Sequence, residues 1–102
     1  MLIAVIGDYS SPQYKELIRS VKRAKPDEEI LDLSRHRQLG WSNMLHAHFT
    51  DISNAHMVII GKDWRNDFAA KRDITHAQSL HKDCFVEIDG QFRPFPEYAG
   101  RT

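Results

Sequence analysis

Apolar runs and amphipathic segments alternate along this chain. Two of the runs, Leu2–Ile6 and Met57–Gly61, are nearly continuous, and each meets a glycine at its end. Such runs are typical of strands that are covered on both faces of a parallel sheet. Glu29–Leu33 has polar interruptions and predicts a short edge strand, and Cys84–Ile88 predicts a fourth strand.

Between the predicted strands, apolar residues recur every three or four positions, which is the spacing of one helix face. The spacing predicts three helices: from Pro12 to just before Pro26, from Trp41 to about Asn54–His56, and from Asp67 to Lys82. Proline suits a first helical turn and stops a helix later on, and aspartate is a good N-cap.

After the fourth strand, Asp89 and Gly90 favour a turn into a short antiparallel strand, Gln91–Arg93. Pro94 and Pro96 then interrupt regular structure, so residues 93–102 are predicted to form an irregular aromatic tail. Three aromatic side chains in or next to this tail must pack on their own domain or on a partner subunit: Phe92, Phe95 and Tyr98.

The strand–helix alternation predicts a doubly wound, flavodoxin- or Rossmann-like α/β fold. It comprises a mainly parallel sheet of four or five strands, in the order 2-1-3-4, with helices on both faces. Its 102 residues suffice for one domain, residues 1–102. In this order, connections leave the first and third strands toward opposite sides. A ligand crevice is therefore expected between residues 7–11 and 61–66.

Composition narrows the choice of partners. Fourteen basic residues balance fourteen acidic ones, so no net field favours polymeric nucleic acid or a membrane surface. No apolar stretch is long enough to span a bilayer and no signal peptide is visible, which favours the cytoplasm. The one cysteine, Cys84, opens an apolar run, and we interpret it as a buried, unreactive thiol.

Several familiar sites are missing. The chain has neither a G-x-G-x-x-G nor a G-x-x-x-x-G-K-[ST] motif, so a dinucleotide or P-loop cofactor site is not predicted. His46 and His48 lie on diverging sides of a helix, as do His76 and His81, and we expect no metal site. No cofactor is therefore predicted.

Asp73 is the most informative carboxylate. It borders the apolar stripe of the third helix, next to the end of the third strand. A half-buried carboxylate at a crevice is costly unless it is paired or has a chemical role. An ion pair with Lys62 or Arg72 is the structural alternative.

Residues on the crevice loops are candidates for ligand binding. Tyr9 could stack on a base or hydrogen-bond a carboxylate. Trp64 could be a stacking wall or a plug over the core, Arg65 could serve a phosphate, and Asp51 could approach the crevice from the second helix. The predicted substrate-binding set is Gly7, Asp8, Ser10, Gly61, Trp64 and Arg65.

Three segments resemble the nucleoside 2-deoxyribosyltransferase-like family, which includes the 2′-deoxynucleoside 5′-monophosphate N-glycosidases. They are a strand with a glycine loop, an aspartate-bearing helix that leads into a strand, and an acidic helix: Ile3–Ser10, Asp51–Ile60 and Asp73–Lys82. The likeness covers about residues 1–88. It implies cleavage or transfer of the N-glycosidic bond of a deoxynucleoside or deoxynucleotide, in a homo-oligomer that is a dimer.

The resemblance also implies a role for each matched acid. Asp73 would be the nucleophile that attacks C1′, Asp51 would place or protonate the base, and Tyr9 would orient the nucleophile. Position 73 carries Asp where the family has Glu, and Arg65–Ala70 replaces a Ser/Gly segment. These departures leave two further hypotheses open: a non-catalytic nucleotide-binding or sensing domain on the same fold, and a structural or interaction protein.

Overall fold

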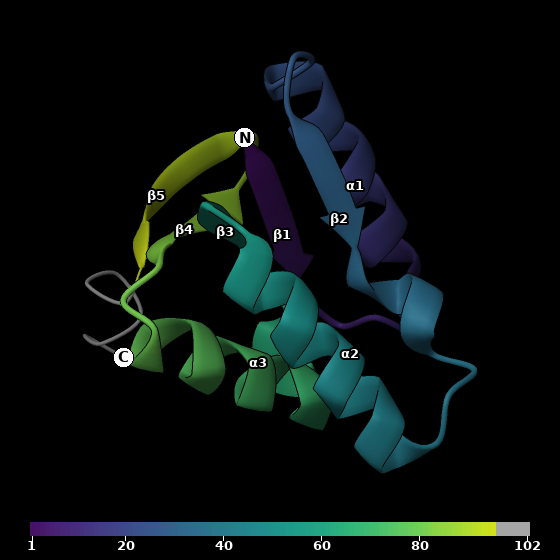
Figure 1. Cartoon of the computed structure of the whole chain (residues 1–102). Helices are drawn as coiled ribbons and strands as arrows, with labels where there is room; N and C mark the ends of the chain where they lie inside the picture. Colours follow the sequence, from purple (N-terminus) through teal and green to yellow (C-terminus); the bar gives the residue numbers. More distant parts are fainter. Residues whose placement is uncertain (96–102) are drawn as a thin grey trace.

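Five strands form one sheet in the computed structural model, which describes residues 1–95 (Figure 1). In spatial order they are β2 (Glu29–Asp32), β1 (Leu2–Ile6), β3 (Met57–Gly61), β4 (Asp83–Ile88) and β5 (Gln91–Phe95). The first four are parallel to one another, and β5 is antiparallel to β4. The predicted order 2-1-3-4, the parallel pairing and the antiparallel return are confirmed.

Helices cover both faces of the sheet, as a doubly wound fold requires. They are α1 (Pro12–Ala24), α2 (Trp41–Asn54) and α3 (Phe68–Ser79), with short 3₁₀ turns η1 (Leu33–His36) and η2 (Trp64–Asn66). Figure 1 shows α2 and α3 side by side on one face and α1 beside β2 on the other. This division follows from right-handed crossovers, because the chain reverses its direction across the sheet after β2.

Helix boundaries follow from local chemistry. Asp67 caps α3 by accepting a hydrogen bond from the Ala70 N–H, and this N-cap confirms the predicted start. At its other end α3 stops at Ser79, three residues before the predicted end at Lys82. His81 takes a left-handed φ of 57°, which no helix tolerates.

The C-terminal strand is longer than predicted. β5 continues through Pro94 to Phe95, although Pro94 was expected to end regular structure. Pro94 pairs opposite Phe85 on an edge strand, where a residue without an N–H can face away from the ladder. Phe95 is buried on its own domain and Phe92 packs against the core, whereas Tyr98 lies outside the described residues.

Helix α1 packs close to the carboxyl ends of β1 and β3. The Tyr14 hydroxyl, buried on α1, donates to the Val5 carbonyl and accepts the Leu33 N–H, so it joins α1, β1 and η1. A Cβ on Gly61 would lie 2.9 Å from Leu17 Cδ2, so a side chain there would have to displace the end of Leu17 on α1.

Candidate functional site

A cleft opens where the connections after β1 and β3 diverge, as topology predicted. It has a volume of about 560 Å³ and lies between those loops and α1. From the two loops, its lining includes Asp8, Ser11, Gly61, Lys62, Asp63 and Asn66. Both loops of the expected crevice thus border the cleft, although Ser10, Trp64 and Arg65 are not among its lining residues.

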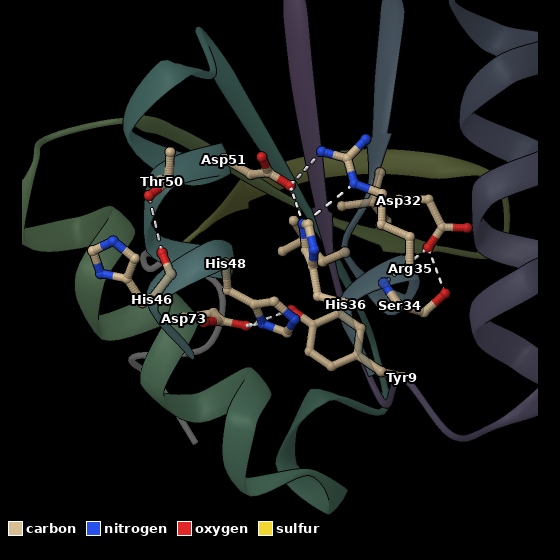
Figure 2. Close-up of polar contacts among 12 residues, drawn as sticks. Tyr9, Asp32, Ser34, Arg35, His36, His46, His48, Thr50, Asp51 and Asp73 are labelled. Atoms are coloured by element: carbon tan, nitrogen blue, oxygen red, sulfur yellow. Dashed lines mark hydrogen bonds and ion pairs between the residues drawn. The ribbon is translucent and has the colours of Figure 1, made fainter. Parts of the chain in front are cut away.

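On the other face of the sheet from this cleft, beneath α2 and α3, three polar side chains from different parts of the chain meet at one oxygen atom. The Tyr9 hydroxyl donates to Asp73 Oδ2 at 2.6 Å, and His48 Nδ1 lies 2.7 Å from the same oxygen. Figure 2 shows Tyr9 reaching this point from the loop after β1, His48 from α2 and Asp73 from α3. We call these residues the Tyr9–His48–Asp73 cluster.

The cluster is almost fully enclosed. Asp73 is 0% exposed, His48 1% and Tyr9 9%. A buried carboxylate needs hydrogen-bond donors, and Asp73 finds them here rather than in an ion pair with Lys62, which instead approaches Asp89 at 3.6 Å. The expected crevice position of Asp73 therefore differs from the observed one, because its side chain points into the protein between α2 and β1.

Tyr9 is held as a hydrogen-bond donor. Burial, followed by the negative charge of Asp73, raises the pKa of the Tyr9 hydroxyl well above its ordinary value, so it stays protonated. Its backbone N–H donates to Asp67 Oδ2 at 3.2 Å, and its ring packs edge-on against Tyr14 and His48. The ring is thus fixed at both ends.

Two buried polar atoms of the cluster have no hydrogen-bond partner among residues 1–95: Asp73 Oδ1 and His48 Nε2. An unsatisfied buried polar atom costs about 1–3 kcal/mol. Both hydrogen bonds fall on Oδ2, so the second carboxylate oxygen and the second ring nitrogen keep unused hydrogen-bonding capacity.

No family model, curated protein or solved structure matched the chain.

Asp51 belongs to a different group. Its Oδ2 lies 2.9 Å from Arg35 Nη2 and 2.9 Å from His36 Nε2, which ties α2 to η1 (Figure 2). The structure brings Tyr9 and Asp73 together, as the resemblance implied, but directs Asp51 to η1. The two groups adjoin through their imidazoles, because the His36 and His48 ring centroids are 5.8 Å apart.

The remaining predicted site residues pack within the fold or form hydrogen bonds inside their own loops. Trp64 packs edge-on against Phe95, with Arg65 stacked on its indole at 4.7 Å, so it plugs the core rather than forming an open wall. The Ser10 hydroxyl donates to Asp8 Oδ1 at 3.0 Å. Gly7, like Gly61, faces α1: a Cβ there would lie 3.1 Å from a ring carbon of Tyr14.

His48 is the cluster member that the sequence analysis does not predict. Its spacing to His46 argues only against a metal site. The available signal was its position on the buried side of α2, where it alternates with Leu45 and Ile52. A histidine within an apolar stripe needs a buried partner.

Among residues 1–95, no three histidine, cysteine, aspartate or glutamate side chains are grouped so that they could hold a metal ion. In the same part of the chain, none of the helices combines the length and the apolar character needed to cross a bilayer.

Burial, followed by the charge of Asp83, raises the pKa of the Cys84 thiol to about 11, so this thiol is a poor nucleophile.

Proposed function

We propose that this domain cleaves or transfers the N-glycosidic bond of a deoxynucleoside or deoxynucleotide, with Asp73 as the nucleophile. The observation that carries the proposal is the 2.6 Å hydrogen bond from the Tyr9 hydroxyl to Asp73 Oδ2. The resemblance in sequence implies this pairing of an orienting tyrosine with a helix carboxylate. The two residues are 64 positions apart in the chain, so their contact is a property of the fold.

The cluster favours attack by one carboxylate oxygen. Tyr9 and His48 both bind Oδ2, which fixes the carboxylate plane and leaves the lone pairs of Oδ1 unused. In the first step Oδ1 forms a bond to C1′ while the C1′–N bond breaks, and the bonding electrons leave with the base. Water or a second base then attacks C1′ and releases Asp73, as in retaining glycosyl transfer.

Substrate can reach Oδ1 only if a covering side chain moves, because Asp73 is 0% exposed. His36 lies against His48 and is the more exposed of the two imidazoles, at 19% against 1%. We expect η1 to shift and displace His36 when substrate binds. The shorter reach of Asp compared with Glu also requires the sugar to come closer to α3, since misplacement by an ångström can cost about a hundredfold in rate.

The cleft beside α1 does not decide the choice of substrate. Its lining carries Asp8, Glu16, Asp63 and Glu87 against Arg23 and Lys62, but it does not include any residue of the Tyr9–His48–Asp73 cluster. The test therefore compares nucleosides with their 5′-monophosphates directly.

The test is release of free base, followed by chromatography, from a panel of 2′-deoxynucleosides and their 5′-monophosphates. We expect the wild type to release base and Asp73→Asn to lose at least about a thousandfold in rate, because the amide cannot act as the nucleophile. Asparagine still presents an oxygen to Tyr9 and His48, so the fold should persist. Asp27→Asn, at an exposed position, is the matched control and should match the wild type.

Complete burial of Asp73 favours a second candidate function, a nucleotide-binding or sensing domain without catalysis. A carboxylate that never meets the sugar would serve only to hold α2, α3 and β1 together. Saturable binding of a nucleoside in equilibrium dialysis, with no base released by any member of the panel, would support this candidate and contradict the enzyme.

The proposal includes a homodimer in the cytoplasm, as the resemblance implies. Exposed apolar side chains at the start of α2 and α3 are compatible with a subunit contact, since the Trp41 and Phe68 rings pair at 5.9 Å while 50% and 61% exposed. Sedimentation equilibrium should give twice the mass of the chain, and a monomer at every concentration would contradict the dimer.

A further inference from the structure

His48 presents a ring nitrogen that nothing in the fold uses. Nδ1 is engaged with Asp73 Oδ2 at 2.7 Å, while Nε2 is buried without a hydrogen-bond partner among residues 1–95. A histidine with a purely structural role normally satisfies both nitrogens when it is this deeply buried. The free Nε2 therefore requires an explanation of its own.

The hydrogen-bond pattern assigns the proton on Nδ1. The Tyr9 hydroxyl is a donor, and both it and His48 meet the same carboxylate oxygen, which only accepts. An ionised Asp73 therefore pairs with an Nδ1–H, and Nε2 is the ring nitrogen that no hydrogen bond holds among residues 1–95. A carboxylate that fixes Nδ1–H and leaves Nε2 reactive is the arrangement that makes histidine a general acid or base.

The charged and titratable groups around His48 come from three elements. Asp73 faces it from α3 and Tyr9 from the end of β1, and His36 adjoins it from η1. Asp51 and Arg35 contact His36 rather than His48. The carboxylate closest to the imidazole is thus that of Asp73.

We propose that His48 is the general acid and base of the glycosidic reaction, the role that the sequence resemblance assigned to Asp51. This inference rests on the proposed function and names a residue that the resemblance does not. Asp51 is occupied by Arg35 and His36, whereas Nε2 of His48 belongs to the side chain that already binds the nucleophile.

His48 gives up one proton in the first step and regains one in the second. As Asp73 Oδ1 bonds to C1′ and the C1′–N bond breaks, the base nitrogen receives the bonding pair and takes the proton from Nε2 of the His48 imidazolium. In the second step a water oxygen bonds to C1′, the C1′–Oδ1 bond breaks, and the water proton passes to Nε2. One deoxynucleoside and one water thus give deoxyribose and free base, with His48 and Asp73 restored.

A pair of substrates distinguishes this role from a structural one. 2′-Deoxyguanosine needs a proton on its leaving base, whereas N7-methyl-2′-deoxyguanosine already carries a positive charge and does not. His48→Asn keeps an amide N–H that can bind Asp73 but lacks Nε2. His46→Asn is the matched control, because His46 is exposed on the same helix.

We expect His48→Asn to lose about 10²–10⁴ in rate on 2′-deoxyguanosine and less than about tenfold on the methylated substrate, with His46→Asn unchanged on both. Equal losses on the two substrates would overturn the acid–base role while leaving the proposed function intact. If the wild type releases base from neither these nor other deoxynucleosides, the proposed function fails and the role of His48 fails with it.

A second measurement needs no variant, in case His48→Asn does not fold. Because an enzymic proton donor removes the advantage of a charged leaving group, the wild type should act on the methylated substrate less than about tenfold faster than on 2′-deoxyguanosine. An acceleration of more than about a hundredfold would show that no group donates a proton to the base, and it would overturn the proposal.

Discussion

Replacing Tyr9 by phenylalanine removes one atom from the Tyr9–His48–Asp73 cluster. The ring can keep its contacts with Tyr14 and His48, and the backbone N–H keeps its bond to Asp67, so only the hydroxyl that donates to Asp73 is lost. A hydrogen bond to a charged, buried acceptor contributes about 1.5–3 kcal/mol. We therefore expect Tyr9→Phe to lower the free energy of unfolding by about 2 kcal/mol.

For a domain of this size, a loss of about 2 kcal/mol lowers Tm by about 8–16 °C. The assay is urea and thermal unfolding followed by circular dichroism. A double-mutant cycle with Asp73→Asn should give a coupling of about 1 kcal/mol, because the neutral amide accepts a weaker bond. Tyr14→Phe, whose hydroxyl binds the Val5 carbonyl instead, should combine additively with Asp73→Asn.

Alkaline pH gives the same variant an independent readout. Because the Tyr9 pKa is raised in the fold, its stabilising effect is complete below about pH 10, where the unfolded chain also keeps the proton. Above that pH the unfolded tyrosine ionises first, and stability falls by up to about 1.4 kcal/mol per pH unit for this group. Tyr9→Phe should therefore lose less stability than the wild type between pH 10 and 11. A Tyr9→Phe protein as stable as the wild type, or strict additivity with Asp73→Asn, would show that the Tyr9–Asp73 hydrogen bond does not stabilise the fold.

Three further predictions follow from other parts of the fold. Gly61→Ala should cost about 1–2 kcal/mol in urea unfolding, because its Cβ would meet Leu17 at 2.9 Å, and the cost should shrink in a Leu17→Ala background; an unchanged cost would contradict the contact. Asp51→Asn should leave the rate of base release within about threefold of the wild type and cost about 1 kcal/mol of stability, and a hundredfold rate loss would return the acid role to Asp51. Cys84 should react with a disulfide reagent at pH 7 more than about a hundredfold more slowly in the native protein than in urea, and equal rates would contradict its burial.

The fold was predictable because its signals are local. Each apolar run and its glycine identified a buried strand, and Asp67 identified the start of α3. The exceptions have local physical reasons: the left-handed His81 shortened α3, and an edge position let β5 pass through Pro94.

The site was only partly predictable, because side-chain partners depend on packing across elements. Asp73 could be selected from its place beside the apolar stripe, but its burial depends on α2 packing against α3. That packing also brings His48 to Asp73, and the spacing of His48 along its own helix does not reveal this contact. Asp51 and His36 are 15 positions apart, and no periodicity within α2 indicates that η1 bends back to meet it.

Peptide mass spectrometry after an acid quench tests the nucleophile most directly. A 2′-fluorinated arabinosyl nucleoside slows the second step, so a sugar bound covalently to the enzyme should accumulate. We expect one sugar adduct per chain, on the peptide that contains Asp73, and none in Asp73→Asn. Base release without an adduct, or with the adduct on another residue, would contradict it.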